Sequence, residues 1–167
     1  YELLRRMGFD TDKNWRDPLL KRTLTWGEVG CFLSHYRLWE ECADSDEMMM
    51  VLEDDAILLE QPQDRWLEGE LTYLTHNEML PDGVVGNRVC YPYWTAAYLI
   101  TPKAAEIFLD TDVDENIIPV DEFMPRMTDR VVMTFNTKAK QRPRSETGTG
   151  VEPKGHTTFV RDFEVHN

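Results

Sequence analysis

Basic residues are scarce in this sequence. Of its 167 residues, 18 are Lys or Arg and 31 are Asp or Glu, which gives a formal net charge of −13 at pH 7. This balance argues against nucleic-acid partners and anionic membrane surfaces, because both select cationic proteins. It also argues against tight phosphate binding by side-chain charge alone, whereas a divalent cation can bridge an acidic site to a phosphate. We interpret most of the acidic residues as the solvated surface of one domain with a single core.

Long apolar runs are missing as well. No window approaches the roughly 20 apolar residues that a membrane-spanning helix needs, and no signal peptide is visible. The chain opens on Tyr1 instead of Met. We therefore expect a processed or excised fragment, whose first residues do not indicate a compartment.

Cysteine is rare and its spacing is uninformative. The chain has three cysteines, an odd number, and they lack the spacing of metal ligands: Cys31, Cys42 and Cys90. Cys31 and Cys42 fall in one helical stretch, and a continuous helix would hold them too far apart along its axis for a disulfide. We expect buried free thiols.

The most informative feature that is present is an acidic triplet after an apolar run. Met48–Leu52 is short and uncharged, as in a strand buried on both faces of a parallel sheet, and Glu53-Asp54-Asp55 follows it directly. Ligands of open α/β sheets bind at the carboxyl ends of strands. If the extended geometry persists, Glu53 and Asp55 point to one side and could hold Mg²⁺, Mn²⁺ or Ca²⁺ together. The alternative is a solvated acidic turn.

The rest of the chain alternates between helical and strand patterns. Thr25-Trp26-Gly27-Glu28 has the form of a capping box, which predicts a helix that ends near 43–46. A clean helix start is also predicted at Thr101-Pro102. Further helices are expected over 2–7, 62–74 and 120–127, and further strands over 84–90, 94–100 and 131–135, with a polar loop over 136–155. The class is therefore α/β with a largely parallel sheet, residues 1–135 forming the domain and 136–167 a polar C-terminal loop or tail of it.

Several blocks of the sequence resemble one known family. The segment Leu24–Glu60, LTWGEVGCFLSHYRLWEECADSDEMMMVLEDDAILLE, resembles the signature of glycosyltransferase family 25. That family includes lipopolysaccharide sugar transferases and collagen hydroxylysine galactosyltransferases. The blocks Tyr93–Tyr98 and Pro119–Pro125, and the loop Arg16–Pro18, are similar to the collagen branch. Together these blocks cover roughly residues 15 to 128.

The resemblance implies a single Rossmann-like glycosyltransferase domain of the GT-A type that uses Mn²⁺ (or Mg²⁺) and a UDP-sugar, with galactose as the expected sugar. In such enzymes the acidic motif holds the cation, and the cation holds the donor diphosphate. Carried over, Asp55 is the first candidate for metal ligand and Asp54 the second, with Glu53 nearer the ribose. His156 is a candidate late metal ligand, although a His in a polar tail is more often simply exposed.

The resemblance also places a candidate catalytic base at the start of the expected helix 120–127. Transfer from a UDP-α-sugar to a β-linked product inverts the anomeric carbon and needs a general base on the acceptor hydroxyl. Asp121 is preferred for this role and Glu122 is the second candidate. The alternative is charge stabilisation of a helix N-terminus, worth about 0.3–1 kcal/mol.

The resemblance suggests further binding residues. Ser34 and His35 would lie beside the donor, and so would Glu28, although the capping box explains Glu28 fully and a buried His is often only packed. Tyr93 and Trp94 could form a platform that stacks on a sugar or acceptor; the alternative is that they belong to the core.

The chain begins after the position of the family's first strand, so we expect its nucleotide pocket to lack that strand. The expected partners are a nucleotide sugar and a glycan or collagen-like protein acceptor, and a homodimer is a further expectation. The compartment would be the ER lumen for a collagen-type enzyme and the cytoplasm for a lipopolysaccharide-type or viral one. The competing hypothesis is a catalytically silent family member that serves as a binding or adhesion domain.

Overall fold

The core of the structure is a mixed five-stranded sheet. The computed structural model describes residues 2–17, 21–75, 84–85, 88–89, 95–112, 114–142 and 158–160. The strand order is β7-β3-β6-β1-β9, and the bounds are β1 Met49–Glu53, β3 Leu71–Tyr73, β6 Ala97–Ile100, β7 Met133–Phe135 and β9 Thr158–Val160. The β3–β7 pair is parallel, whereas β1–β6, β1–β9 and β3–β6 are antiparallel. The expectation of a largely parallel sheet is therefore wrong, because alternating helices and strands establish an α/β class without fixing strand direction.

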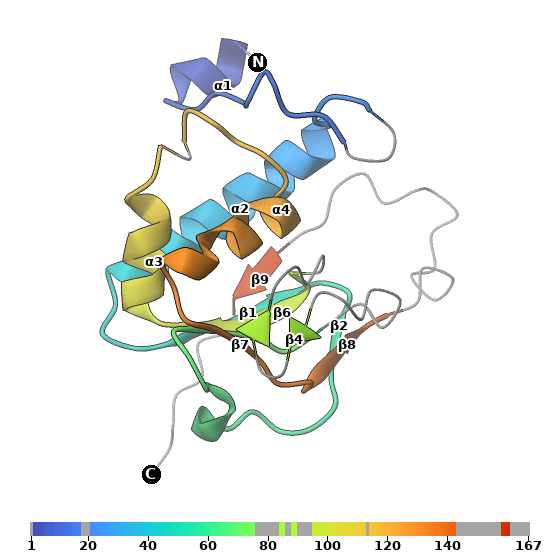
Figure 1. Ribbon diagram of the computed structural model, residues 1–167, viewed down its shortest axis with the longest axis vertical. Coiled ribbons are helices and arrows are strands. Elements are labelled where there is room, and N and C mark those ends of the chain that lie inside the picture. Colours follow the sequence, from blue (N-terminus) through green and yellow to red (C-terminus); the bar gives the residue numbers. More distant parts are fainter. Residues whose placement is uncertain are drawn as a thin grey trace.

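One face of the sheet is covered by helices. Figure 1 shows α2 (Trp26–Ala43), α3 (Pro102–Leu109) and α4 (Val120–Arg126) gathered on that side. The predicted capping box of α2 and the Thr101 cap of α3 are confirmed. The apolar face of α2 buries Phe32 and Trp39 completely, and their rings pack edge-to-face with centroids 5.8 Å apart. The short helix α1 (Glu2–Arg6) also agrees with its prediction, and a 3-10 turn, η3 (Met127–Asp129), follows α4.

The opposite face has its own smaller core. A two-stranded ribbon of β2 (Ala56–Leu58) and β8 (Ala139–Gln141) accompanies a 3-10 turn, η1 (Asp64–Trp66), there. The second core consists of side chains from the sheet and these elements: Met50, Trp66, Leu74, Ala97, Leu99 and Ala139. The period-two alternation of the strands divides their side chains between the two cores.

The predicted helix over 62–74 is wrong. Only the η1 turn forms there, and the segment then becomes β3, whose three residues are all buried between β6 and β7. Gly69 precedes this strand, and a Cβ at that position would lie 2.6 Å from the Val132 carbonyl oxygen. Tertiary burial and this close backbone approach outweigh the helical pattern.

Other predicted boundaries also shift. Strand β8 lies in the expected loop 136–155, and β9 lies in the expected tail; the domain boundary at 135 stays a prediction. The expected strand 84–90 is described as two short strands, β4 (Val84–Val85) and β5 (Arg88–Val89), paired with each other. In the described part of the chain, no helix has both the length and the apolar composition to span a membrane.

Candidate active site

The acidic triplet divides at the end of β1. Glu53 is the last residue of β1, and Val51 and Glu53 share the face of the strand that meets α2. Glu53 is only 8% exposed. Asp54 and Asp55 form the turn into β2, so the strand alternation that would have aligned Glu53 with Asp55 stops at Glu53. That expected alignment is wrong, because a turn replaces the extended geometry on which it depended.

Glu53 joins a buried polar network, which we define as Trp39, Tyr98, His35, Glu53, Thr95 and Asp121. His35, with 0% exposure, faces Glu53 across a His35 Nε2 to Glu53 Oε1 distance of 3.3 Å. The other ring nitrogen, Nδ1, lies 2.8 Å from the Tyr98 hydroxyl, and the two rings stack. Trp39 donates its indole N–H to the same hydroxyl at 3.1 Å. Helix α2 supplies His35 and Trp39 from successive turns of one face.

The donors of this network have a consistent direction. The Trp39 indole can only donate, so the Tyr98 oxygen accepts from it. The Tyr98 hydroxyl can then donate to His35 Nδ1, which leaves the proton of His35 on Nε2, facing Glu53. This tautomer gives every member of the chain a partner, as buried polar groups require.

Thr95 connects Glu53 to Asp121. Its hydroxyl lies 2.9 Å from Glu53 Oε1 and 2.8 Å from Asp121 Oδ1, and its backbone N–H donates to Asp121 Oδ1 at 3.0 Å. A threonine hydroxyl carries one proton, so it can donate to only one of these carboxylates at a time. If Glu53 and Asp121 were both ionised, one of the two carboxylates would therefore lack the hydrogen bond from the Thr95 hydroxyl.

Asp121 holds its proton unusually tightly. Burial and then the charge of Glu53 raise the pKa of Asp121 from 3.8 to about 7, against the lowering effect of the bonds from Thr95. Burial and the neighbouring Asp121 likewise raise the pKa of Tyr73 well above its usual value. The fully buried Tyr73 hydroxyl has no hydrogen-bond partner among the described residues. A carboxyl group that exchanges its proton near neutral pH suits general acid–base chemistry.

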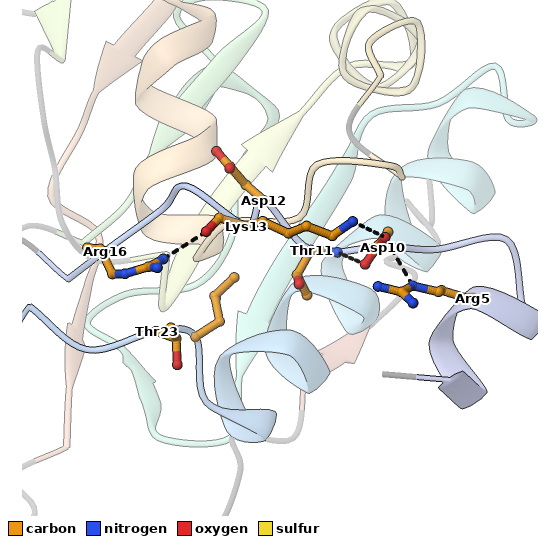
Figure 2. A pocket seen from close by; sticks show the side chains of 8 residues that line it. Arg5, Asp10, Thr11, Asp12, Lys13, Arg16 and Thr23 are labelled. Carbon is orange, nitrogen blue, oxygen red and sulfur yellow. Dashed lines mark hydrogen bonds and ion pairs between the residues drawn. The ribbon is translucent and has the colours of Figure 1, made fainter.

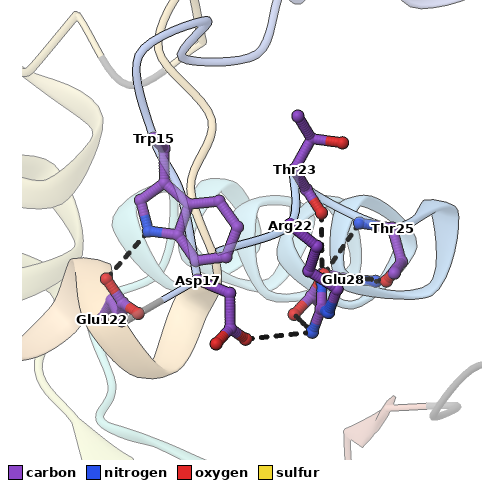
Figure 3. A network of polar contacts seen from close by, with 7 residues as sticks. All are labelled: Trp15, Asp17, Arg22, Thr23, Thr25, Glu28 and Glu122. Carbon is purple, nitrogen blue, oxygen red and sulfur yellow. Dashed lines mark hydrogen bonds and ion pairs between the residues drawn. The ribbon is translucent and has the colours of Figure 1, made fainter. Parts of the chain in front are cut away.

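Glu122 points away from this network. Its carboxylate accepts the Trp15 indole N–H at 2.9 Å and an Arg126 N–H at 3.2 Å, both at Oε2. Figure 3 shows Glu122 turned toward Trp15 in the N-terminal segment. Glu122 therefore anchors that segment to α4, which favours Asp121 over Glu122 for the predicted base.

Glu28 is fully engaged in holding the start of α2. Arg22 donates to both of its carboxylate oxygens, at 2.8 and 2.9 Å, and Thr25 donates its backbone N–H and its hydroxyl at 2.7 and 2.8 Å. Asp17 pairs with the same arginine at 3.3 Å (Figure 3). Burial alone would raise the pKa of Glu28, but the bonds from Arg22 and Thr25 lower it overall. The donor-binding role predicted for Glu28 stays a prediction.

The remaining predicted residues lie in different settings. The Ser34 hydroxyl donates to the Gly30 carbonyl within its own helix at 2.9 Å. Tyr93, Trp94 and His156 lie outside the described residues, as does Cys90, so their roles stay predictions.

The two candidate metal ligands lie on the turn that follows β1. Asp54 is exposed, and Asp55 is half-buried and accepts the Gln141 side-chain N–H at 2.7 Å. Carboxylate oxygens on a turn are donors of the kind that Mn²⁺ and Mg²⁺ take. The Gln141 bond holds Asp55 Oδ2 in place through β8, and the other oxygen, Oδ1, is buried, whereas Asp54 is exposed. The two carboxylates supply the type of oxygen donor that fits a hard divalent cation.

A cavity of about 240 Å³ lies near the N-terminal segment, with basic residues in its wall. Figure 2 shows Arg5 and Lys13 directed toward Asp10, and the nitrogen–oxygen distances are 3.1 and 3.6 Å. Arg16 donates to the Lys13 and Trp15 carbonyls instead. Because these cations are already partnered, we do not assign the cavity to a phosphate.

Sequence reasoning missed four residues of the site: Trp39, Tyr98 and Thr95 of the buried polar network, and Cys31 beside it. Thr95 and Tyr98 lie within the block that carries the family resemblance, but nothing in their own spacing indicates contact with Glu53. Cys31 was expected to be only a buried thiol, yet it lies with His35 and Glu53. The spacing of Cys31 and His35, one helical turn apart, was the available signal.

The sequence has clear relatives. Residues 6–81 match the sequence profile of "Glycosyltransferase family 25 (LPS biosynthesis protein)". The chain is 37% identical over 147 residues to the "Probable inactive glycosyltransferase 25 family member 3" of Rattus norvegicus, covering 77% of this chain and 26% of the relative. The chain is a homologue of the glycosyltransferase family 25 proteins.

Other relatives of this family 25 homologue bear the names of enzymes. It is 36% identical over 144 residues to "Procollagen galactosyltransferase 1-B" of Xenopus laevis, covering 74% of the chain and 24% of the relative. It is 36% identical over 133 residues to "Procollagen galactosyltransferase 2" of Mus musculus, covering 68% and 21%. The chain thus spans about a quarter of the length of the curated relatives that it matches. No solved structure matches it.

Proposed function

We propose that this family 25 homologue takes part in inverting, metal-dependent transfer of a sugar from a UDP-sugar to an acceptor hydroxyl, and that Asp121 is the general base. The observation that carries the proposal is the placement of Asp121: half-buried, two hydrogen bonds from Thr95, and a pKa of about 7. A base whose pKa lies near the working pH is both available and strong enough to take a proton.

In this proposal, proton transfer and metal binding are carried out by different carboxylates. Asp121 takes the proton of the acceptor hydroxyl, and Thr95 holds the carboxylate through its backbone N–H. Asp55 and Asp54 would hold Mn²⁺ or Mg²⁺, with His156 as a further candidate ligand. When bound, the cation would neutralise charge on the departing nucleotide. Glu53 sets the electrostatic environment of Asp121 from the interior.

The finer assignments rest on the relatives. Two of them are named procollagen galactosyltransferases, which supports galactose as the donor sugar and a hydroxyl of a collagen-like protein as the acceptor. A GT-A type of Rossmann-like fold is proposed on the same basis, and the mixed sheet with its helices is compatible with the coarser class, an α/β domain.

The experiment is UDP release from UDP-galactose by the purified protein with Mn²⁺, with and without a hydroxylysine-containing collagen peptide. We expect acceptor-dependent UDP release, and we expect Asp121→Asn to reduce it by roughly 10²- to 10⁴-fold, the contribution of a general base. Asp46→Asn, on the exposed turn after α2, is the matched control and should leave the rate unchanged. Equal rates for both variants would refute the role of Asp121.

The second candidate is a silent domain that binds without catalysis. The observation in its favour is that the Rattus norvegicus relative is named as probably inactive. Calorimetry separates the two: absence of both Mn²⁺ binding and UDP binding, together with absence of turnover, would establish the silent alternative. Micromolar UDP binding that depends on Mn²⁺ would support the transferase.

A further inference from the structure

We propose that Cys31, His35 and Glu53 form a binding site for one Zn²⁺ ion in the interior, between α2 and the end of β1. The sulfur of Cys31, a ring nitrogen of His35 and a carboxylate oxygen of Glu53 all lie within 4.8 Å of one another. Within the described residues, this is the one set of three metal-ligating side chains that meets so closely. The site differs from the proposed Mn²⁺ site on Asp54 and Asp55, and it does not depend on sugar transfer.

The ligand types indicate the metal. Thiolate, imidazole and carboxylate together are the donors of Zn²⁺, whereas Mn²⁺ and Mg²⁺ prefer oxygen alone. Three protein ligands leave the fourth tetrahedral position for a water molecule, as in many zinc sites.

The geometry is close to what such an ion needs. Metal–ligand distances of 2.0–2.3 Å in a tetrahedron place neighbouring ligand atoms about 3.3–3.6 Å apart. His35 Nε2 and Glu53 Oε1 are already 3.3 Å apart. The remaining closure falls on Cys31, which shares a face of α2 with His35 one turn away. The Cys31 sulfur lies within 4.8 Å of the other two ligand atoms.

The surroundings support a cation. Burial raises the pKa of the Cys31 thiol most strongly, and the negative charges of four carboxylates raise it further: Glu53, Asp121, Glu28 and Asp55. A metal-free site therefore holds Cys31 as a thiol, and binding of Zn²⁺ releases its proton to solvent. A divalent charge at this point would offset the mutual repulsion of Glu53 and Asp121.

A hydrogen-bond partner also orients the imidazole. Ligand histidines usually pair their second nitrogen with a protein group that fixes the ring. Tyr98 occupies that position at 2.8 Å from Nδ1, and Trp39 in turn holds the Tyr98 oxygen. Binding at Nε2 requires the other tautomer of His35, with its proton on Nδ1, so the direction of the His35–Tyr98 hydrogen bond reverses and Nδ1 donates to the Tyr98 oxygen. Tyr98 is thus a positioning residue of the proposed site.

The experiment uses Co²⁺ as a spectroscopic probe of the chelator-treated, purified protein. We expect one equivalent to bind with a thiolate-to-Co²⁺ charge-transfer band and the visible bands of a tetrahedral ion, and Zn²⁺ to displace it. Cys31→Ser should abolish the charge-transfer band, while Cys42→Ser, at the other described cysteine of α2, should retain it. Tyr98→Phe should keep the band and weaken the affinity by roughly 10- to 100-fold.

Three outcomes would overturn the proposal: no charge-transfer band in the wild-type protein, a band that survives in Cys31→Ser, or a band that Zn²⁺ does not remove. The wild-type titration needs no variant to fold, so it decides the question even if a substitution unfolds the protein. Asp55→Asn separates the two metal hypotheses, because it should abolish UDP release and leave the Co²⁺ spectrum unchanged. If the protein shows no sugar transfer, the expected Co²⁺ spectrum stays the same, so the two proposals can fail separately.

Discussion

Asp121→Asn should separate the function of this carboxylate from its effect on stability. Asparagine keeps an oxygen that can accept both bonds from Thr95, but it carries no charge and does not titrate. If Asp121 is a base held at a cost to the fold, its replacement should reduce turnover by roughly 10²- to 10⁴-fold and stabilise the protein at neutral and alkaline pH. Opposite effects on activity and stability are typical of functional sites.

The magnitude follows from the pKa of Asp121, which the fold raises from 3.8 to about 7. At 1.36 kcal/mol per pKa unit, ionising this group in the folded protein costs roughly 4 kcal/mol more than in the unfolded chain. The native state binds the proton more tightly, so the wild-type protein loses this stability as the pH rises from 3.8 through about 7. The asparagine variant lacks that loss.

The assay is urea unfolding of both proteins between pH 5 and pH 8 in the presence of a chelator. The stability difference between Asp121→Asn and the wild type should grow in favour of the variant by about 2.5 kcal/mol over this range. Asp46→Asn, at an exposed position, should show a constant difference. The growth with pH is the decisive quantity, because any fixed effect of the amide cancels from it. A constant difference for Asp121→Asn, or one that grows in favour of the wild type, would refute the reasoning.

Two further predictions concern the supports of the site and the fold. Thr95→Val removes the hydroxyl between Glu53 and Asp121, so it should lower the free energy of unfolding by about 1–3 kcal/mol. Because that hydroxyl lowers the pKa of Asp121, the pH midpoint of turnover should rise above its wild-type value. An unchanged midpoint would contradict the assigned contact. Gly69→Ala should destabilise the protein by about 1–3 kcal/mol in urea unfolding, because its Cβ would lie 2.6 Å from a backbone oxygen. Gly30→Ala is its matched control: it lies in α2 with nothing within 4 Å, so it should stabilise by about 0.5–1 kcal/mol, and equal effects of the two substitutions would count against the described packing.

The parts of this protein that local chemistry decides were predicted from the sequence. The capping box at Thr25, the Thr101-Pro102 helix start and the strand that ends at Glu53 all follow from neighbouring residues. Short-range rules suffice there, because each cap or alternation is complete within a few positions of the chain. The acidic end of β1 and the family resemblance were visible for the same reason.

Only the tertiary structure decided how those parts meet. The segment 62–74 became a strand because it is buried between β6 and β7, and the sheet is mixed because its neighbours come from distant parts of the chain. The site depends on long-range contacts, since Thr95 lies 42 positions from Glu53 and 26 from Asp121 along the chain. Burial then changes the chemistry of these groups, which turns Asp121 into a candidate base and gives Cys31 metal-ligating neighbours. The sequence by itself determined which residues could react, and the packing of α2 and α4 against the strand ends decided which of them come together.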